Sequence, residues 1–526
     1  MERRLKSLEG LNTGKIVLVS NRASLVLQET PQGLKGERAS GGLVSALEPL
    51  AIAAQGVWIA WGGRLGRDFP GARIGVPLDR SRYTLREVIL TPEEVEGYYH
   101  VYANRVLWPL CHYFLERCSY NPEAWVFYRN VNEKFAKITC EEAAPGDFIW
   151  VHDYHLPLVP GLIRAENPQA RIGFFWHIPF PDPDIFGVLP QAREILTGLL
   201  GSDLLGFHVQ KYCRNFLNSV ELILGARADH ERGAVEWEGR RVLVRSIPVG
   251  VDYEAFAGLA RRPEVRSQAR ELRDLLGTGY VALGVDRLDY TKGIKERLLG
   301  IELFFEKNPA YCGRFTYVQV AVPTRPGVAE YQSLRREVEE IVGRINGRFG
   351  KPGWTPVVYF YRALSRSELV AYYLAADLLL VTPLRDGLNL VAKEYVASHA
   401  GNGVLILSPF AGAAEELAPA LFINPYNPEE LGDQIRFGLE MPEAEKTRRM
   451  EALYDLVARR DVTWWIDTFL AEWSAKGAEP ALRVFRNEQQ TGIRSPLKVE
   501  TRGRGKEKKA DLAAFWSSKA TKGERF

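Results

Sequence analysis

The sequence predicts an α/β fold in which two Rossmann-like, doubly wound domains face a cleft. Three observations lead to this prediction. Short apolar runs typical of buried parallel strands alternate with amphipathic helical segments along most of the chain. This alternation stops in a charged helical stretch at residues 251–278 and then starts again. The chain has 526 residues, which is long enough for two sizeable cores.

The first half of the chain opens with a strand at residues 15–21, and Arg22 stands at its carboxyl end. A loop then runs to Ser40, and Gly41-Gly42 leads into an apolar helix. Glycine here lets the backbone approach a ligand closely, although a simple turn uses the same residues. An aromatic group around residues 98–109 is more typical of a core than of a site. Further strands are expected at residues 57–61, 148–151, 171–176, 204–208 and 244–248.

The second half repeats this plan after the charged stretch. Its first strand is expected at residues 280–285 and its second at residues 315–322. An apolar segment at residues 463–473 predicts a closing helix that packs across the junction of the two domains. Four further apolar runs lie between the second strand and the closing helix, and the last of them is short. They predict the remaining strands, at residues 357–361, 377–381, 403–408 and 421–424.

These elements divide the chain into six parts. Two of the parts are the Rossmann-like domains, and the closing helix follows the second. The tail is rich in Lys, Arg, Gly and Ser, which predicts that it is largely disordered. The parts are a polar lead-in (1–14), an N-terminal domain (15–250), a linker (251–278), a C-terminal domain (279–462), the closing helix (463–475) and a polar, basic tail (476–526).

The net charge of +3 is unevenly distributed along the chain. Residues 491–526 contain ten Lys/Arg and four Asp/Glu, so this segment carries +6 and the rest carries −3. The body of the protein is therefore slightly acidic, and its charge gives no reason to expect a nucleic-acid partner. The basic tail is read as a solvated extension, with a nucleic-acid-binding arm as the alternative.

The cysteines and the apolar runs predict a cytoplasmic protein. The five cysteines are scattered and include no C-x-x-C pair, which favours a reducing compartment over disulfides or a zinc site. The charged residues at the start of the chain are not followed by the apolar segment of a signal peptide. The sequence also lacks an apolar run of about 18 residues, so no membrane partner is expected.

The segment that follows the strand at residues 377–381 carries the clearest sign of a ligand site. Pro383 and Gly387 end that strand in a short loop, and Asn389 opens a helix. The free N–H groups and the dipole at such a helix start suit a phosphate or diphosphate. Asp386 and Glu394 are unhelpful for phosphate, so we expect them to accept hydrogen bonds from sugar hydroxyls. An ordinary strand–helix crossover with surface charges is the alternative.

Polar residues also follow other predicted strands, where open α/β sheets place their ligands. In the second domain, Arg287 and Lys292 would suit a diphosphate. In the first domain, Asp153 and His177 would contact hydroxyls. Together these groups suggest a sugar nucleotide and a second anion such as a sugar phosphate. A surface ion network is the bland alternative.

Two common nucleotide-binding classes lose support. The dinucleotide fingerprint G-x-G-x-x-G does not follow the first strand, and no Walker A motif occurs. Nicotinamide-dependent enzymes and P-loop ATPases are therefore not favoured.

Many segments, in the same order, resemble the trehalose-6-phosphate synthases, the retaining glycosyltransferases of family 20 with two Rossmann domains (GT-B type). The resemblance covers residues 15–475. Its longest segments are Gly173-Phe-Phe-Trp-His177-Ile-Pro-Phe-Pro181 and Thr382-Pro-Leu-Arg-Asp-Gly-Leu-Asn-Leu-Val-Ala-Lys-Glu-Tyr395. Shorter ones are Ser20-Asn-Arg22, Ser40-Gly-Gly42, Tyr98-Tyr99, Leu107-Trp108-Pro109, His152-Asp-Tyr-His155, Arg287-Leu-Asp-Tyr-Thr-Lys292-Gly293, Gly343-Arg-Ile-Asn-Gly347 and Pro409-Phe-Ala-Gly-Ala413.

The resemblance implies roles for individual residues. The C-terminal domain would hold the nucleotide sugar and the N-terminal domain the acceptor. Donor-binding residues would be Gly42, Arg287, Lys292, Asp386, Asn389, Leu390, Val391 and Glu394. Acceptor-binding residues would be Arg22, Tyr99, Trp108, Asp153 and Arg325. Catalytic residues would be Arg287, Lys292, His177, Asp153 and Asp386. Neither a cofactor nor a metal ion is expected, because cations would replace Mg²⁺ at the leaving diphosphate.

The implied reaction joins UDP-glucose and glucose 6-phosphate to give α,α-trehalose 6-phosphate and UDP, with retention of configuration. The family's aromatic base contact is replaced by Ala363-Leu364, so GDP or ADP donors stay possible alternatives. A glucosylglycerol-phosphate synthase, a cyclitol pseudo-glycosyltransferase and a non-catalytic regulatory subunit are the competing functions. A homo-oligomer is also compatible with the resemblance.

Overall fold

A computed structural model describes residues 14–31, 33–38, 41–66, 71–76, 82–324, 328–399, 401 and 403–475. Arg325, Ser40, most of the predicted lead-in and the predicted basic tail lie outside the described residues. The two sheets described below belong to one compact unit of the chain.

The first sheet has ten strands in the order β10-β11-β12-β9-β8-β7-β1-β4-β6-β5. The seven strands from β12 to β6 are parallel, and antiparallel strands extend the sheet at both edges. The chain order reverses between β7 and β1, which makes this the switch point where such sheets bind ligands. The strands are β1 (Ile16–Arg22), β4 (Val57–Leu65), β5 (Arg73–Val76), β6 (Tyr83–Leu90), β7 (Phe148–His152), β8 (Arg171–Phe175), β9 (Leu204–Phe207), β10 (Arg227–Asp229), β11 (Ala234–Trp237) and β12 (Arg240–Ser246).

All the strands expected in this sheet are confirmed, but four further strands of the sheet were not predicted. These are β5, β6, β10 and β11, which lie toward the edges of the sheet. The strand β6 was missed because it contains Arg86 and Glu87, which break its apolar run. Glu87 is nevertheless fully buried, because the guanidinium of Arg64 donates to both of its carboxylate oxygens. Sequence alone does not reveal such a partner.

The predicted loop between Arg22 and Ser40 is wrong in one respect, because it contains a β-hairpin. The strands β2 (Leu25–Thr30) and β3 (Gly33–Arg38) pair with each other in an antiparallel ladder. Arg64 of β4 ties the hairpin to the sheet through Glu29, at 2.6 Å. β2 begins with the short apolar run Leu25-Val-Leu27, but the rest of the hairpin is mostly polar, so the pattern is too short to mark two strands in the sequence.

The second sheet has six parallel strands in the order β15-β14-β13-β16-β17-β18. This is the doubly wound order 3-2-1-4-5-6, and its switch point lies between β13 and β16. All six strands were predicted. They are β13 (Tyr280–Arg287), β14 (Phe315–Val322), β15 (Val357–Phe360), β16 (Leu378–Val381), β17 (Val404–Leu407) and β18 (Leu421–Phe422).

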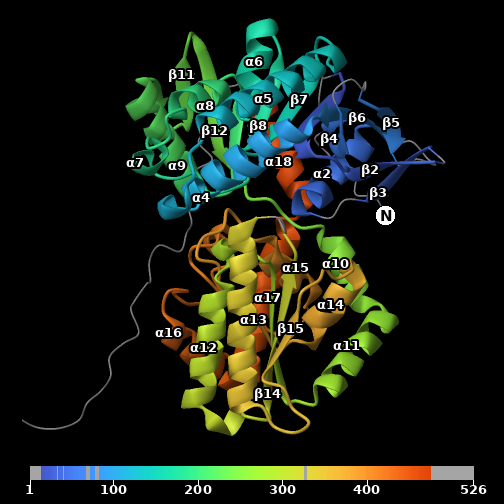
Figure 1. The fold of residues 1–526 in the computed structure, drawn as a ribbon, viewed down its shortest axis with the longest axis vertical. Coiled ribbons are helices and arrows are strands. Elements are labelled where there is room, and N and C mark those ends of the chain that lie inside the picture. The colour runs from blue at the N-terminus through green and yellow to red at the C-terminus, as the bar shows by residue number, and fades with distance from the viewer. Residues whose placement is uncertain are drawn as a thin grey trace, which may run out of the picture. The chain divides into compact units, whose positions relative to one another are not determined.

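Helices cover both faces of the first sheet (Figure 1). One face packs against α5, α6, α8, α9 and a π-helix, η1, and the other packs against α2 and α18. These elements are α2 (Gly42–Ala53), η1 (Val95–Leu107), α5 (Pro122–Glu142), α6 (Val159–Glu166), α8 (Ala192–Leu199), α9 (Gln210–Ser219) and α18 (Val462–Ser474). Shorter pieces are α3 (Pro92–Glu94), α4 (Trp108–Cys111), η2 (Leu115–Arg117), α7 (Pro183–Phe186) and η3 (Val220–Leu224).

The second sheet is covered in the same way. Side chains of one face pack against α12, α13 and α16, and those of the other face pack against α10, α11, α14, α15 and α17 (Figure 1). The helices are α10 (Tyr253–Arg261), α11 (Pro263–Leu276), α12 (Ile294–Lys307), α13 (Ala329–Phe349), α14 (Arg366–Ala375), α15 (Leu390–Ser398), α16 (Pro428–Glu440) and α17 (Glu443–Arg459). The 3-10 turns are η4 (Tyr290–Lys292), η5 (Pro309–Tyr311) and η6 (Gly412–Glu415).

The helix α18 follows the second sheet in the chain but packs on the first. The ring of Trp150 on β7 lies 5.1 Å from Trp465 and 4.2 Å from Phe469. The start of α18 meets the segment that leaves the first sheet, where Val462 N donates to Val251 O at 2.9 Å. The two segments that join the sheets therefore lie side by side. No helix among the described residues is long and apolar enough to cross a bilayer.

Candidate active site

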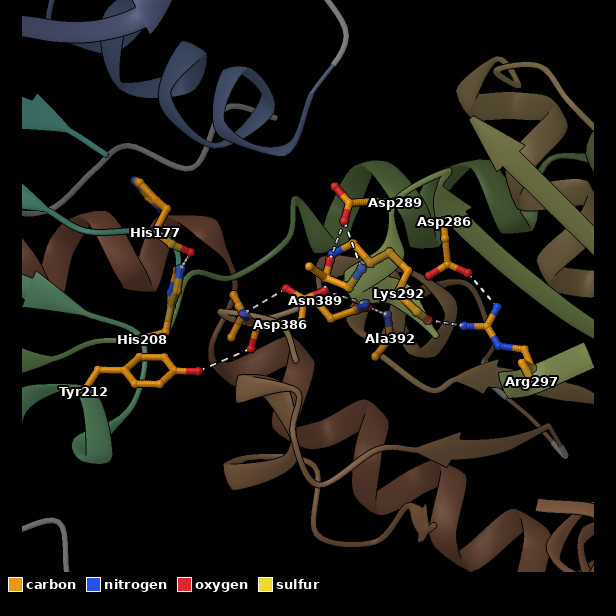
Figure 2. A network of polar contacts seen from close by, with 12 residues as sticks. His177, His208, Tyr212, Asp286, Asp289, Lys292, Arg297, Asp386, Asn389 and Ala392 are labelled. Carbon is orange, nitrogen blue, oxygen red and sulfur yellow. Dashed lines mark hydrogen bonds and ion pairs between the residues drawn. The ribbon is translucent and has the colours of Figure 1, made fainter. Parts of the chain in front are cut away.

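A buried ion pair occupies the switch point of the second sheet. Lys292 lies in η4 after β13, and Asp386 lies in the loop after β16. Lys292 Nζ donates to Asp386 Oδ2 at 2.5 Å, and both residues are buried. Figure 2 shows the two side chains next to Asn389. The two residues were predicted to serve one site, and the structure brings them into direct contact.

The carboxylate of Asp386 accepts further hydrogen bonds within its loop. Asn389 Nδ2 donates to Oδ2 at 3.1 Å, and Leu388 N donates to Oδ1 at 3.3 Å. Burial alone would raise the pKa of Asp386, but the adjacent Lys292 ammonium outweighs it and holds the pKa below its usual value. Asp386 is therefore an ionised acceptor at neutral pH, with its position fixed from both sides.

The helix α15 begins at this loop with an exposed backbone. Asn389 is its N-cap, with a φ of 77°, and the side-chain oxygen accepts from Ala392 N at 3.2 Å. A helix leaves its first N–H groups without intrahelical partners, so those of Leu390 and Val391 remain available to an anion. The positive φ is a strained conformation of the kind that clusters at functional sites.

Two more predicted donor residues lie beside this helix start. Gly42, at the start of α2, approaches Leu390 so closely that a Cβ there would lie 2.7 Å from Leu390 Cδ1. Glu394 lies one turn into α15, and Tyr373 donates its hydroxyl to Glu394 Oε2 at 2.9 Å. Burial raises the pKa of Glu394, although Tyr373 and Arg366 partly oppose this effect. The close approach at Gly42 places the start of α2 against the first residue of α15.

Asp153 stands at the switch point of the first sheet, directly after β7. It has a φ of 76°, and its Oδ1 accepts from Tyr154 N at 2.9 Å and from His177 N at 3.3 Å. Burial raises the pKa of Asp153 to about 7, although these two bonds and the charge of Arg287 oppose the shift. Arg287 ends β13 in the second sheet, so a charge from the second sheet affects a carboxyl group of the first.

His177 follows β8 and lies within a group of histidines. Its Nε2 lies 3.2 Å from His152 Nδ1, and His208 donates from Nε2 to the His177 carbonyl at 3.1 Å. Burial lowers the pKa of His177 well below its usual value, and the neighbouring His208 adds to this shift. The imidazole is therefore neutral at pH 7. A Cβ on Gly387 would lie 2.4 Å from the His177 carbonyl oxygen, so the Asp386 loop lies directly on this residue.

Arg22 is held between two aromatic rings at the end of β1. Its guanidinium carbon lies 4.3 Å from the ring centre of Trp61 and 5.0 Å from that of Tyr99. Tyr99 in turn stacks on His155, with ring centres 5.8 Å apart and an angle of 14°. The exposed guanidinium is thus fixed in direction but keeps its hydrogen-bond donors available to an anion.

Trp108 connects the two sheets. It lies in α4 and is buried, and the guanidinium carbon of Arg287 lies 5.2 Å from its ring centre. The ring of His112 packs against it at 4.1 Å. Arg287, predicted to bind the donor, therefore contacts Trp108, predicted to bind the acceptor. This contact places the two halves of the predicted site next to each other.

The model of one family, described as glycosyltransferase family 20, matches residues 14–475. This range contains both sheets and every predicted site residue. The chain belongs to glycosyltransferase family 20.

Relatives of this family-20 chain cover most of it. A bifunctional trehalose-6-phosphate synthase/phosphatase of Thermoproteus tenax is 42% identical, over 90% of this chain and 66% of its own length. A trehalose-6-phosphate synthase of Mycolicibacterium paratuberculosis is 41% identical, over 89% of this chain and 97% of its own. The chain spans only 62% of a UDP-forming alpha,alpha-trehalose-phosphate synthase A of Dictyostelium discoideum.

Solved structures give the same family and establish the GT-B fold of this chain. One, described as trehalose-6-phosphate from E. coli bound with UDP-2-fluoro glucose, has a TM-score of 0.81 and 34% identity and covers 89% of this chain and all of that one. Another is an alpha,alpha-trehalose-phosphate synthase from Burkholderia xenovorans in complex with glucose-6-phosphate, with a TM-score of 0.80 and 34% identity over 88% of this chain and 100% of that one.

Sequence reasoning missed three residues that this family-20 chain places at the site. Trp61 holds Arg22, and His112 packs on Trp108. Tyr212 on α9 donates its hydroxyl to the backbone carbonyl of Asp386 at 3.3 Å, across the two sheets. His112 follows Trp108 closely in the sequence, so a wider search there would have found it, and Trp61 stands at the end of a predicted strand. Tyr212 carries no local signal.

Two predictions about the site stay untested. Arg325 lies outside the described residues, so its place relative to the acceptor residues is not part of this geometry. Within the described part of the chain, no group of three or more His, Cys, Asp or Glu residues is arranged to hold a metal ion. The roles of the site residues are taken up as proposals below.

The raised pKa of Asp153 predicts a pH-dependent stability. The pKa of Asp153 is higher in the folded protein than in the unfolded chain, so the folded protein binds the carboxyl proton more tightly. The stability that this protonated carboxyl contributes is complete below about pH 4 and is lost as the pH rises from about 4 to above 7. Asp153→Asn should therefore gain on the order of 2 kcal/mol relative to the wild type between pH 5 and pH 7.5. Urea denaturation of both proteins at the two pH values measures this. A wild-type–variant difference that is the same at both values contradicts the prediction.

Proposed function

We propose that the protein transfers glucose from UDP-glucose to glucose 6-phosphate and so forms α,α-trehalose 6-phosphate and UDP. The names of the relatives and the ligands of the two solved structures support this reaction. One observation from the chain itself carries the proposal. A buried Lys292–Asp386 pair lies at the switch point of one sheet, and Arg287 reaches from the same edge to Trp108 beside the other.

In this proposal the second sheet binds the donor. Arg287, Lys292 and the first-turn N–H groups of Leu390 and Val391 hold the diphosphate. The remaining donor residues bind the sugars. Glu394 accepts bonds from the ribose, Asp386, Asn389 and His177 bind the glucose, and Gly42 allows the backbone of α2 to approach the donor. The neutral imidazole of His177 suits a hydroxyl, because it can donate or accept without a charge.

The first sheet binds the acceptor in the same proposal. Arg22, Tyr99 and Trp108 hold the phosphate of glucose 6-phosphate, and Asp153 orients its sugar hydroxyls. Arg325 joins this set on the resemblance alone. The cradle of Trp61 and Tyr99 around Arg22 supports the assignment, because it fixes a cation at the switch point without occupying its donors.

The chemistry follows from the charges. As the bond between glucose C1 and the phosphate oxygen breaks, negative charge collects on the leaving diphosphate. Arg287, Lys292 and the start of α15 stabilise this charge without reorganisation. The acceptor hydroxyl attacks C1 from the face that the phosphate leaves, and its proton passes to the leaving phosphate oxygen. Attack on that face retains the configuration at C1.

Competing functions differ in the acceptor or in turnover. A glucosylglycerol-phosphate synthase would use glycerol 3-phosphate, and a pseudo-glycosyltransferase would use cyclitol substrates. A regulatory subunit would bind sugar phosphate without turnover, but the charged residues at the described part of the site are all present. Ala363 and Leu364 stand where an aromatic base contact was expected, so GDP and ADP donors belong in the assay.

The expected result is that UDP is released from UDP-glucose only when glucose 6-phosphate is present. Mass spectrometry of the products with a panel of donors and acceptors measures this, and NMR of the disaccharide gives the anomeric configuration. Free glucose and glycerol 3-phosphate serve as acceptor controls. UDP release that does not depend on the acceptor, or turnover only with another acceptor, contradicts the proposal.

The proposal also covers partners and location. The partners are the two small-molecule substrates, and no metal is assigned a step. The five cysteines are free, which supports a reducing compartment and hence a cytoplasmic location.

A further inference from the structure

One buried arginine below the site binds several groups at once. Arg297 lies on α12 with an exposed fraction of 0%. Its Nη1 donates to Asp286 Oδ2 at 2.6 Å, and its Nε donates to Thr382 Oγ1 at 2.8 Å. Its Nη2 donates to the backbone carbonyl of Lys292 at 3.2 Å. Figure 2 shows the guanidinium beside Asp286 and Lys292.

Two groups on β14 complete the surroundings of this guanidinium. Nη1 also donates to Gln319 Oε1 at 3.0 Å and to the Tyr317 hydroxyl at 3.3 Å. Burial alone would lower the pKa of Arg297, but the Asp286 carboxylate raises it above its usual value. The side chain is therefore permanently charged, and its planar fork is fixed by partners in three directions.

Three partners of Arg297 belong to the two segments that meet at the switch point. Asp286 directly precedes Arg287, and Lys292 carries the ammonium of the buried ion pair. Thr382 follows β16 and starts the loop that leads to Asp386. One rigid guanidinium thus bonds to both loops.

The two loops also contact each other through their backbones. Leu384 N donates to Thr291 O at 2.8 Å. Gly293 has a φ of 64°, and a Cβ there would lie 2.3 Å from the carbonyl oxygen of Thr382. Such close backbone packing leaves little freedom, so a shift of the guanidinium must move both loops.

We propose that Arg297 is a positioning residue for the transfer reaction. It aligns the loop of Arg287 and Lys292 with the loop of Asp386, so that the Lys292–Asp386 pair is preorganised toward the donor. This inference rests on the proposed function for its effect on turnover, while the alignment of the two loops stands on the contacts alone. Arg297 itself is buried beneath the loops and acts through the residues it holds.

A purely structural role is the alternative. A buried ion pair is weak support for stability, because well-packed apolar residues can often replace it without loss. The fork geometry distinguishes the two roles. A lysine keeps the charge next to Asp286 but cannot also reach Thr382 Oγ1 and the Lys292 carbonyl. Positioning of the two loops therefore requires the planar fork of arginine, whereas neutralising the charge of Asp286 requires only a positive charge.

The test uses Arg297→Lys and the isosteric Thr382→Val in the full chain, each with a matched control. Arg164→Lys is the arginine control, because Arg164 binds Asp203 at 3.0 Å and backbone carbonyls of the first sheet. Thr139→Val is the threonine control, because buried Thr139 bonds only a carbonyl of its own helix among the contacts described. Turnover is measured where each variant is fully folded.

We expect kcat to fall about tenfold to a hundredfold in Arg297→Lys and severalfold in Thr382→Val, with the KM for glucose 6-phosphate nearly unchanged. Both controls should keep kcat within about twofold. Hydrogen exchange is the second readout, and the amides of residues 286–293 and 382–389 should exchange at least about tenfold faster in Arg297→Lys than in Arg164→Lys.

The two readouts separate this inference from the proposed function. A wild type without turnover contradicts the proposed function, and hydrogen exchange of the two loops then decides the positioning role alone. Wild-type kcat in Arg297→Lys, or unchanged exchange in both loops, overturns the inference. A kcat loss in Arg164→Lys as large as that in Arg297→Lys also overturns it.

Discussion

Arg287→Ala is expected to lower kcat by about a hundredfold or more, which corresponds to roughly 3 kcal/mol of transition-state stabilisation. Arg287 is the exposed cation at the end of β13, and its guanidinium already lies over Trp108. In the proposed mechanism its charge is needed most when the diphosphate leaves, so the loss should fall on kcat more than on the KM for UDP-glucose. Initial rates of UDP release at saturating substrates measure the effect.

Arg348→Ala is the matched control for this variant. Arg348 is also a half-exposed arginine of the second sheet's lobe, and its guanidinium carbon lies 4.9 Å from the ring of Phe349. It pairs with Glu302 and Glu306 on α12, away from the strand ends. Its kcat should stay at the wild-type value. If Arg287→Ala kept wild-type turnover, Arg287 would have no part in stabilising the leaving group.

Arg287→Lys separates charge from shape in the same assay. Lysine keeps the positive charge but loses the flat fork that lies over Trp108 and, in the proposed function, binds two phosphate oxygens together. An intermediate loss of activity is therefore expected. A loss as large as that of alanine would assign the effect to the stacked geometry, and full activity would assign it to charge alone.

The central strands were predictable because both faces of a parallel sheet are buried. The run Leu378–Val381 is one example, since each of its four residues is buried and each is apolar. The same rule fails for β6, where Glu87 is buried against Arg64, and for the hairpin β2–β3, which is mostly polar. Their burial depends on partners far away in the sequence, which local patterning does not contain.

The site shows a similar division. Individual site residues could be predicted from the sequence, because ligands of doubly wound sheets bind at the switch points, beside the carboxyl ends of the strands. The contacts between these residues could not be predicted from the sequence. Lys292 and Asp386 are 94 positions apart, and the contact of Arg287 with Trp108 joins two sheets. Tyr212 and Arg297 were missed because their contacts with the site are made only in the folded protein, with residues far away in the sequence.

Burial controls the charge states of the site. It lowers the pKa of His152 and His177, so both imidazoles are neutral at pH 7, and it raises the pKa of Asp153 to about 7, so this carboxyl is only partly ionised there. Asp386 keeps its charge mainly because Lys292 lies beside it and opposes the effect of burial. The proposed site therefore combines neutral hydrogen-bonding groups, which suit sugar hydroxyls, with a small number of fixed charges, which suit phosphates.

Lys292→Met should destabilise the fold and abolish most of the activity. Removing one partner of a buried ion pair leaves an uncompensated charge, which costs about 3–5 kcal/mol. In the proposed function the same change also removes a cation from the leaving diphosphate, so turnover should fall by a hundredfold or more in the folded fraction. Urea denaturation and initial rates measure the two effects. Lys295→Met is the matched control, because Lys295 pairs at 3.1 Å with Glu337 and both side chains are 46% exposed.

The pH dependence of this variant tests the cause of its instability. In the wild type, Lys292 lowers the pKa of Asp386, so the stability this pair contributes is present above the unfolded pKa of about 4 and is lost as the pH falls below it. In Lys292→Met the buried Asp386 loses its counter-ion, and burial then raises its pKa. The stability difference between wild type and variant should therefore be largest at pH 7 and should shrink as the pH falls toward 4. Lys295→Met should show a difference below about 1 kcal/mol at every pH. A deficit in Lys292→Met that stays constant with pH would mean that lost packing, and not the unpaired carboxylate, causes the instability.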